Sequence, residues 1–251
     1  MSGQFRLADG GRIDRSQPIS FRFNGRQYKG FEGDTLASAL VAHGVRLVAR
    51  SFKYHRPRGI MSAGIEETNA LVQLVGEEDE PNVPATIVNL REGLEAESVN
   101  CWPSVNHDFG AINERFWRLF PAGFYYKTFM WPASMWHFYE YFIRRMAGMG
   151  RSPKTYNADD HYEKRFHSCD VMVVGSGPAG LAAALAAGRS GARVLLVDDQ
   201  REAGGDLLNT TAEIDGKDAM NWVTEAVAEI AEMGEVVHLQ NATAAGYYDH
   251  N

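Results

Sequence analysis

Cysteine is scarce in this sequence. Cys101 and Cys169 are the only two in 251 residues, and they lie 68 positions apart with no Cys-x-x-Cys pair. Such spacing supports neither a disulfide framework nor a metal cluster held by cysteines. The low cysteine count fits a reducing compartment, so we expect a cytoplasmic protein without a metal site.

Long apolar runs are also missing. The N-terminal segment has no apolar core followed by a small-residue cleavage site, which argues against a secretory signal. The most apolar stretch, Phe116–Phe142, is interrupted by charged residues and prolines. It therefore lacks the roughly 20 consecutive apolar residues that a membrane helix requires. The sequence contains no internal repeat and no low-complexity tract, and we predict no membrane segment.

Positive charge is in deficit. Against 25 Lys and Arg stand 32 Asp and Glu, which gives a net charge of −7 at pH 7. No global positive field is available to attract nucleic acid or an anionic membrane, so any anion site must be local. The proportions of hydrophobic (45%) and charged (23%) residues are those of a globular protein, and 251 residues suffice for two domains.

The first hundred residues predict a small α+β domain. Ile19–Phe23 alternates in polarity, Asn24-Gly25 forms a turn, and Arg26–Gly30 returns, which is a strong hairpin pattern. Two later apolar runs, Leu71–Val75 and Thr86–Leu90, predict further strands.

A helix is expected between the hairpin and these later strands. Asp34 or Thr35 can cap it, and Gly44 ends it. The order strand, strand, helix, strand, strand is typical of a β-grasp domain, which we place at residues 1–98.

Residues 99–165 form an aromatic-rich connector. Of the 28 aromatic residues in the chain, 13 fall within Phe116–Phe142. One interpretation is a mostly helical segment that packs these rings on its two neighbours. The other is that part of this surface docks a further chain or domain.

The third part, residues 166–251, begins as a dinucleotide-binding domain. The apolar strand Asp170–Val174 runs directly into Gly-Ser-Gly-Pro-Ala-Gly at positions 175–180. An Ala- and Leu-rich helix and a second apolar strand, Arg193–Val197, follow. This strand, glycine turn, helix and strand make a Rossmann-type unit, so the chain combines an α+β and an α/β part.

Each glycine of the fingerprint has a physical role. Gly175 permits the tight turn, Gly177 lets the backbone approach a pyrophosphate, and Gly180 lets helix and strand pack closely. The helix N-terminus supplies amide donors and a positive dipole end. Asp198, which lies 23 positions after Gly175 at the end of the next strand, is expected to accept from ribose hydroxyls. A carboxylate here disfavours a 2′-phosphate, so NAD or FAD is preferred over NADP.

A second glycine turn, Gly204-Gly205, follows the acid. After it, the sequence predicts a helix over Asp215–Met233, a strand over Val236–Leu239 and a possible strand start at Ala242–Tyr248. A doubly wound domain usually has five or six strands. We therefore expect the sheet to be incomplete and the sequence to be a truncated reading frame or a fragment.

Several segments together resemble one family, the alpha subunit of heterotetrameric sarcosine oxidase. The resemblance rests on Gly33–Leu40, Arg50–Gly59, Glu66–Ala70, Gly123–Met130 and the glycine fingerprint. It covers essentially the whole chain and implies the N-terminal portion of a subunit that is about four times longer. The missing part would include a C-terminal domain that resembles a folate-binding aminomethyltransferase.

Relatives of the first domain resemble ferredoxins that hold a [2Fe–2S] cluster on four cysteines of a loop. Here Ser51–Gly64 contains no cysteine, and two thiols in the chain cannot replace four, so the domain is predicted to be ferredoxin-like but cluster-less. The same loop is basic, with the side chains of Arg46, Arg50, Lys53, His55, Arg56 and Arg58. It is either a solvated face or a site that pairs with an acidic surface of a partner or with a phosphate. His55 is expected to be a neutral or paired loop residue.

The resemblance implies oxidative demethylation of sarcosine to glycine, with formaldehyde or methylenetetrahydrofolate and hydrogen peroxide as the other products. It places FAD and FMN on the beta subunit, tetrahydrofolate on the missing C-terminal part, and NAD on this chain, with beta, gamma and delta subunits as partners. No catalytic residue is assigned. The predicted NAD-binding residues are Gly175, Gly177, Ala179 and Gly180 at the pyrophosphate, Asp198 and Asp199 at the ribose, and the weaker candidates Gln200, Gly205 and Asp206.

Two alternatives remain open. The chain could be an alpha-like subunit of an opine or other amine dehydrogenase complex, although the missing cluster cysteines argue against it. It could also be a non-catalytic assembly module whose aromatic connector and basic loop dock partners. The fingerprint does not distinguish FAD from NAD, because both cofactors carry the same ADP moiety.

Overall fold

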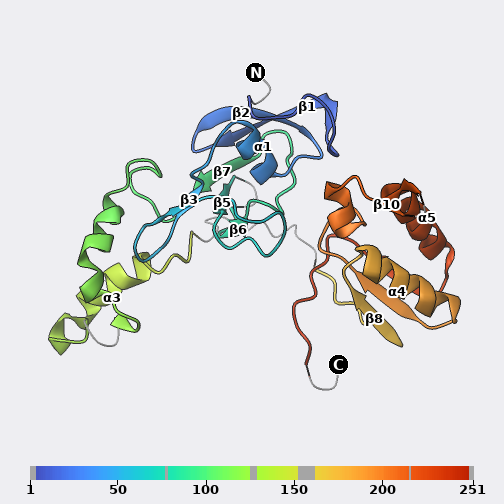
Figure 1. Cartoon of the computed structure of the whole chain (residues 1–251). Helices are drawn as coiled ribbons and strands as arrows, with labels where there is room; N and C mark the ends of the chain where they lie inside the picture. Colours follow the sequence, from blue (N-terminus) through green and yellow to red (C-terminus); the bar gives the residue numbers. More distant parts are fainter. Residues whose placement is uncertain (1–3, 77–78, 125–128, 152–161, 215, 249–251) are drawn as a thin grey trace. The chain divides into compact units, whose positions relative to one another are not determined.

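The computed structural model describes residues 4–76, 79–124, 129–151, 162–214 and 216–248. The chain divides into two compact units, Met1–Asn157 and Ala158–Asn251. The first contains a five-stranded sheet and the second a three-stranded sheet, and each unit has its own apolar core (Figure 1). The finer division into residues 1–98, 99–165 and 166–251 stays a prediction.

The first unit opens with the predicted hairpin. β1 (Asp14–Phe23) pairs antiparallel with β2 (Arg26–Glu32). Asn24 and Gly25 have positive φ angles of 51° and 73°, the conformation that a two-residue type I′ turn requires. Phe21 and Phe23 are buried while Arg22 between them is exposed, so the alternation of the sequence places one face of β1 in the core.

Helix α1 (Leu36–Ala42) follows, and Thr35 is its N-cap. The Thr35 hydroxyl accepts from the Ser38 backbone N–H at 3.2 Å, and the Ser38 hydroxyl accepts from the Thr35 N–H at 3.0 Å, which forms a capping box. The other candidate cap, Asp34, is buried and binds the guanidinium of Arg6 at 2.7 Å instead. Leu36 and Leu40 of the helix are fully buried in the core of the first unit.

The sheet has the strand order β2-β1-β7-β5-β6. β5 (Leu71–Val75) has the predicted bounds, and it pairs antiparallel with β6 (Val83–Pro84) and with β7 (Glu95–Ser98). β7 lies in the centre and is parallel to β1. A hairpin, a helix and a parallel central strand give the expected β-grasp arrangement.

The prediction of a strand over Thr86–Leu90 is wrong. The carbonyl of Val88 accepts from the Leu36 N–H at 2.8 Å, and the Leu90 N–H donates to the Asp34 carbonyl at 2.9 Å. The backbone of this segment is therefore satisfied by the chain at the start of α1 rather than by the sheet. Val88 and Leu90 are buried because the segment covers the core, which explains its strand-like apolar pattern.

The basic loop and the connector complete the first unit. β3 (Ala49–Arg50) and β4 (Pro57–Arg58) form a short hairpin in the loop. The connector contains the 3₁₀ helices η1 (Phe109–Leu119) and η2 (Ala133–Met135) and the helix α3 (Trp136–Arg145). These three elements agree with a mostly helical segment.

The described aromatic rings of the connector are largely exposed. None of the residues in η1, η2 or α3 is buried. Phe129 contacts Phe120, Phe124 and Tyr139 with ring centroids 5.7 to 6.0 Å apart, so these rings pack on one another. Tyr125 and Tyr126 lie outside the described residues.

The second unit is a parallel sheet with the strand order β12-β9-β8. Its elements are β8 (Val171–Val174), α4 (Pro178–Arg189), β9 (Val194–Val197), η3 (Gly205–Asn209), β10 (Glu213–Ile214), β11 (Lys217–Asp218), α5 (Ala219–Glu232) and β12 (Val236–Leu239). Three strands and two helices follow the sequence predictions, whereas η3, β10 and β11 were not predicted, and the last helix begins at Ala219, after β11, rather than at Asp215. Asp215, the predicted start of the last helix, lies outside the described residues.

Both helices cover the same face of this sheet. Val194 and Leu196 of β9 are buried in one cluster with residues of α4 and α5. On the opposite face, Met172 and Val174 of β8 are 52% and 64% exposed. Ala242–Tyr248 forms no strand, so the suggested fourth strand is wrong. No helix among the described residues has the length and apolarity needed to cross a membrane.

Candidate dinucleotide-binding site

The site is built on the turn between β8 and α4. Gly175 ends the strand with a φ of 94°, a backbone conformation that L-residues with a side chain rarely adopt. Gly177 is the N-cap of α4, and Pro178 occupies the first helical position, where its missing N–H costs no hydrogen bond. The sequence therefore turns sharply from strand to helix and aims the helix N-terminus at the end of the sheet.

Gly180 is required by packing. A Cβ atom on Gly180 would overlap the carbonyl oxygen of Gly175. The first turn of α4 can lie this close to the end of β8 only because the residue has no side chain. The role predicted for the third glycine of the fingerprint agrees with this contact.

The two glycine turns lie against each other. The Gly204 N–H donates to the Ser176 carbonyl at 2.9 Å, and a Cβ atom on Gly205 would come within 3.0 Å of the Gly177 Cα. Gly204 and Gly205 have φ angles of 130° and 53°. The second turn, which follows the acid in the sequence, is thus part of the same site.

Asp198 lies at the end of β9 and binds the first glycine turn. One carboxylate oxygen accepts from the backbone N–H of Ser176 and from its hydroxyl, the latter at 2.8 Å. The other oxygen accepts from the Gln200 N–H at 2.7 Å. Asp198 and Ser176 are both buried, at 6% and 0% exposure. The acid therefore joins the ends of two parallel strands, and the oxygen that accepts only from Gln200 retains a lone pair for a further donor.

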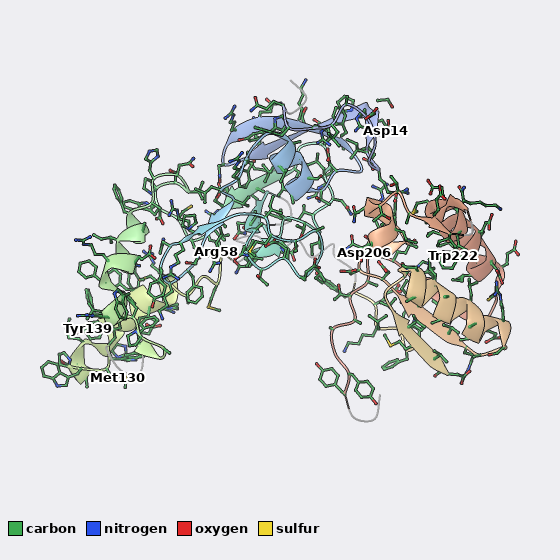
Figure 2. The ribbon with its side chains drawn as sticks, viewed as in Figure 1. Asp14, Arg58, Met130, Tyr139, Asp206 and Trp222 are labelled. Carbon is green, nitrogen blue, oxygen red and sulfur yellow. The ribbon has the colours of Figure 1, made fainter. Side chains whose placement is uncertain are left out.

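The other predicted residues lie around this centre. Ala179 is exposed in the first turn of α4, and Asp199 and Gln200 are half-buried beyond the end of β9. Asp206 is exposed in the first turn of η3 (Figure 2). The hydrogen bonds and close contacts described above bring together the first glycine turn, Asp198 and Gly205. Asp206 lies at the exposed edge of this set of residues.

Two neighbours of the site were not predicted. Ser176 is the hydrogen-bond partner of Asp198. In the sequence, the hydroxyl residue at the second position of the glycine turn is the feature that could have indicated this contact. His238 of β12 is the other. Burial lowers the pKa of His238 below its usual value, and the negative charge of Asp198 partly opposes that shift. The imidazole next to the acid is therefore neutral at pH 7.

The residues fit an adenine dinucleotide. No side chain caps the N-terminus of α4, so the amides of its first turn are available to a pyrophosphate. A Cβ atom on Gly177 would meet the protein only at 3.8 Å, from Gly205, which leaves its other side open to a ligand. In Rossmann-type turns, backbone donors of this kind bind a diphosphate and a carboxylate at this place binds a ribose.

The basic loop is held by acids of the same chain. Asp108, whose side chain is fully buried, accepts from His55 Nδ1 at 2.7 Å and lies 3.6 Å from the Arg50 guanidinium. Arg56 pairs with Glu114 of η1 at 3.0 Å. These residues are thus neither purely solvated nor left for a partner surface, because their acidic partners lie in the connector of the same chain. His55 is a paired loop residue, as expected.

Two family models match the chain. One describes a 2Fe-2S iron-sulfur cluster binding domain and matches residues 16–101, and the other describes an FAD dependent oxidoreductase and matches residues 170–246. These ranges contain the β-grasp sheet and the glycine-turn unit. The predicted fold class, a ferredoxin-like domain followed by a nucleotide-binding domain, is confirmed.

Curated relatives match almost the entire chain. Sarcosine oxidase subunit alpha of Rhizobium meliloti is 54% identical over 98% of this chain. The resemblance to sarcosine oxidase subunit alpha is confirmed. The same subunit of Corynebacterium sp. strain U-96 is 36% identical over 96% of the chain. The chain spans 25% and 21% of the length of these two subunits.

The fold is also found in a solved structure. L-proline dehydrogenase from P. horikoshii superposes with a TM-score of 0.53 over 91% of this chain and 34% of that protein, at 18% identity. A short region of 40 residues is 50% identical to the soluble pyridine nucleotide transhydrogenase of Pseudomonas putida. The chain is thus similar to sarcosine oxidase alpha subunits over almost its whole length, and it shares its fold with a solved dehydrogenase.

A [2Fe–2S] cluster does not fit the first domain. Only Cys101 falls within the range matched by the cluster-binding family, whereas such a cluster needs four ligands. Burial raises the pKa of the Cys101 thiol, and the negative charge of Asp108 raises it further. Among the described residues, no group of three or more His, Cys, Asp or Glu side chains could hold a metal ion.

Proposed function

We propose that the chain is the NAD-binding, N-terminal part of the alpha subunit of a heterotetrameric sarcosine oxidase. In the proposed reaction sarcosine, oxygen and water give glycine, formaldehyde and hydrogen peroxide. When tetrahydrofolate is present, the one-carbon unit leaves as methylenetetrahydrofolate. The observation that carries this proposal is the 54% identity over 98% of the chain to sarcosine oxidase subunit alpha of Rhizobium meliloti.

Within this complex the chain binds NAD and does not oxidise the amine. The pyrophosphate lies against Gly175, Gly177 and Gly180 at the N-terminus of α4, and the ribose hydroxyls donate to Asp198 and Asp199. Oxidation of the CH–NH bond, with oxygen as acceptor, takes place on flavins of the beta subunit, and gamma and delta subunits complete the cytoplasmic assembly. The free amides at the start of α4 and the buried Asp198 support this role.

FAD is the second candidate for the same site. The family model that matches residues 170–246 describes FAD dependent oxidoreductases, which supports a flavin dinucleotide. Calorimetric titration of the purified chain with NAD and, separately, with FAD distinguishes the two cofactors. NAD binding in the micromolar range with weak FAD binding supports the first proposal, and the reverse order supports the second.

Activity of the purified complex tests the reaction. The complex is isolated from the native host through an affinity tag on this chain and is supplied with sarcosine, opines or proline in turn. Oxygen uptake and peroxide release that depend on sarcosine support the proposal. Oxidation of an opine with an artificial acceptor would place the chain in another amine dehydrogenase, and a chain without dinucleotide affinity would be an assembly module.

A further inference from the structure

The loop between β4 and β5, residues 59–70, contains a buried acid that the proposed function does not use. Glu67 is 2% exposed, whereas its neighbour Glu66 is exposed. Burial of a carboxylate carries a large desolvation cost unless the charge is compensated by donors. The Glu67 carboxylate therefore needs hydrogen-bond donors around it.

Four backbone amides compensate it. One carboxylate oxygen of Glu67 accepts from the Met61 N–H at 2.6 Å and the Ser62 N–H at 2.9 Å. The other accepts from the Asn69 N–H at 2.6 Å and the Ala70 N–H at 3.0 Å. The donors come from both limbs of the loop, so the carboxylate ties the two limbs together.

The charge state follows from these donors. Burial raises the pKa of Glu67, but the four backbone hydrogen bonds together outweigh burial and lower the pKa to about 2. The group is therefore a carboxylate throughout the physiological range. Further bonds fix the frame of the loop, since the Thr86 hydroxyl donates to the Gly64 carbonyl at 2.7 Å. Arg58 donates to the Asn69 side chain, also at 2.7 Å.

Converging backbone N–H groups form an anion-binding concavity, and such concavities hold phosphates and iron–sulfur clusters. This loop lies inside the range matched by the 2Fe-2S cluster binding family, residues 16–101, yet residues 59–70 contain no cysteine. An anion receptor is thus present without the thiolates that would attach a cluster. The anion it holds is a side chain of the loop itself.

We propose that the Glu67 carboxylate takes the place of an iron–sulfur cluster as the anion that organises this loop. The β-grasp domain then keeps its fold without a redox centre and acts as a scaffold rather than an electron carrier. The inference concerns residues 59–70 only and does not depend on which dinucleotide the second unit binds.

The first test compares Glu67→Gln with the matched control Glu66→Gln in the full chain. Glutamine keeps the shape but loses the charge and one acceptor, so two of the four buried donors face an amide NH₂ group. We expect the equilibrium constant for unfolding in urea to rise about 100-fold for Glu67→Gln and less than about threefold for Glu66→Gln. Equal, small effects of the two variants would overturn the proposal.

The second test is rescue by an external anion. In Glu67→Ala the four amides are left without their acceptor, and formate is small enough to replace a carboxylate. We expect sodium formate to raise the thermal midpoint of Glu67→Ala. Formate should not raise the midpoint of Glu66→Ala, and sodium chloride at equal ionic strength should not raise the midpoint of Glu67→Ala. The same response to chloride as to formate would contradict a specific carboxylate site.

The third test needs no variant and remains available if the substitutions prevent folding. Carbon NMR of the Glu67 carboxyl in the wild-type chain should show protonation only below about pH 3. Anaerobic incubation with ferrous iron and sulfide should leave the chain without bound cluster. Titration near the ordinary pKa of glutamate, or uptake of two iron and two sulfide ions per chain, would overturn the proposal.

Discussion

The carboxylate of Asp198 accepts a hydrogen bond from the hydroxyl of Ser176 at 2.8 Å, and this contact links the end of β9 to the glycine turn after β8. An acid that the sequence assigns to the ribose therefore also holds the turn assigned to the pyrophosphate. Binding of the two halves of an ADP moiety should be coupled through this pair.

Loss of charge at Asp198 should weaken dinucleotide binding. We expect Asp198→Asn to raise the Kd for NAD about tenfold or more, because charge-assisted hydrogen bonds to the ribose are lost. Preference for NAD over NADP should fall as well, since the repulsion of a 2′-phosphate is removed. Ser176→Ala should have a smaller effect, and Glu225→Gln on the exposed side of α5 should have none. Calorimetric titration of the three variants with NAD, and of Asp198→Asn with NADP, checks these expectations. Full NAD affinity in Asp198→Asn together with a loss of affinity in Asp199→Asn would assign the ribose to Asp199 instead.

Two glycines of the turn should separate binding from folding. A Cβ atom on Gly177 meets the protein only at 3.8 Å, so Gly177→Ala should fold normally but bind NAD much more weakly. A Cβ atom on Gly180 overlaps the Gly175 carbonyl, so Gly180→Ala should lower the stability of the second unit by about 2 kcal/mol or more. Urea unfolding and NAD titration of both variants make the comparison. A Gly177→Ala chain that binds NAD with wild-type affinity would contradict the pyrophosphate position.

Acid should destabilise the first unit through Glu67. Its folded-state pKa of about 2 lies below its ordinary value of 4.5, so its ionised form is favoured by the native loop. The stability it contributes is complete above pH 4.5 and is lost as the pH falls towards 2, and it amounts to about 3 kcal/mol. Urea unfolding as a function of pH should show this decline in the wild type and in Glu66→Gln, and a flatter curve in Glu67→Gln. Parallel curves for the wild type and Glu67→Gln would contradict the assignment.

The buried and exposed ion pairs of the basic loop should differ in strength. Asp108→Asn leaves His55 and Arg50 without a charged partner in a buried position, and we expect a loss of about 3 kcal/mol. Glu114→Gln breaks an ion pair whose side chains are 55% and 56% exposed, and we expect a loss of about 0.5 kcal/mol or less. Denaturant unfolding of the two variants gives both values. Similar losses would mean that the loop and connector are not joined through Asp108.

Features that depend on neighbouring residues were predictable from the sequence. The Asn24-Gly25 turn, the Leu71–Val75 strand and the strand, turn and helix around Gly175 depend on a few adjacent side chains, and each lies where the sequence placed it. The second glycine turn lies against the first, as an acid followed by a glycine pair at this spacing, a local pattern, predicts.

Features that depend on distant residues were not predictable. β7 is the central strand of the first sheet, but its sequence Glu-Ala-Glu-Ser has one apolar residue, and its position comes from pairing with β1 and β5. Asp108 binds Arg50 and His55 across more than 50 positions of sequence. Glu67 looks like one of two adjacent acids until the loop closes around it.

The most direct test of the account is the identity of the dinucleotide released from the native complex. The complex should be isolated through a tag on this chain, denatured, and analysed by mass spectrometry. We predict one NAD for each chain from the wild type and a large loss of NAD from a complex with Asp198→Asn, with the flavins of the partner subunit retained in both. Recovery of FAD in place of NAD at the site of this chain, or NAD content unchanged by Asp198→Asn, would contradict the account.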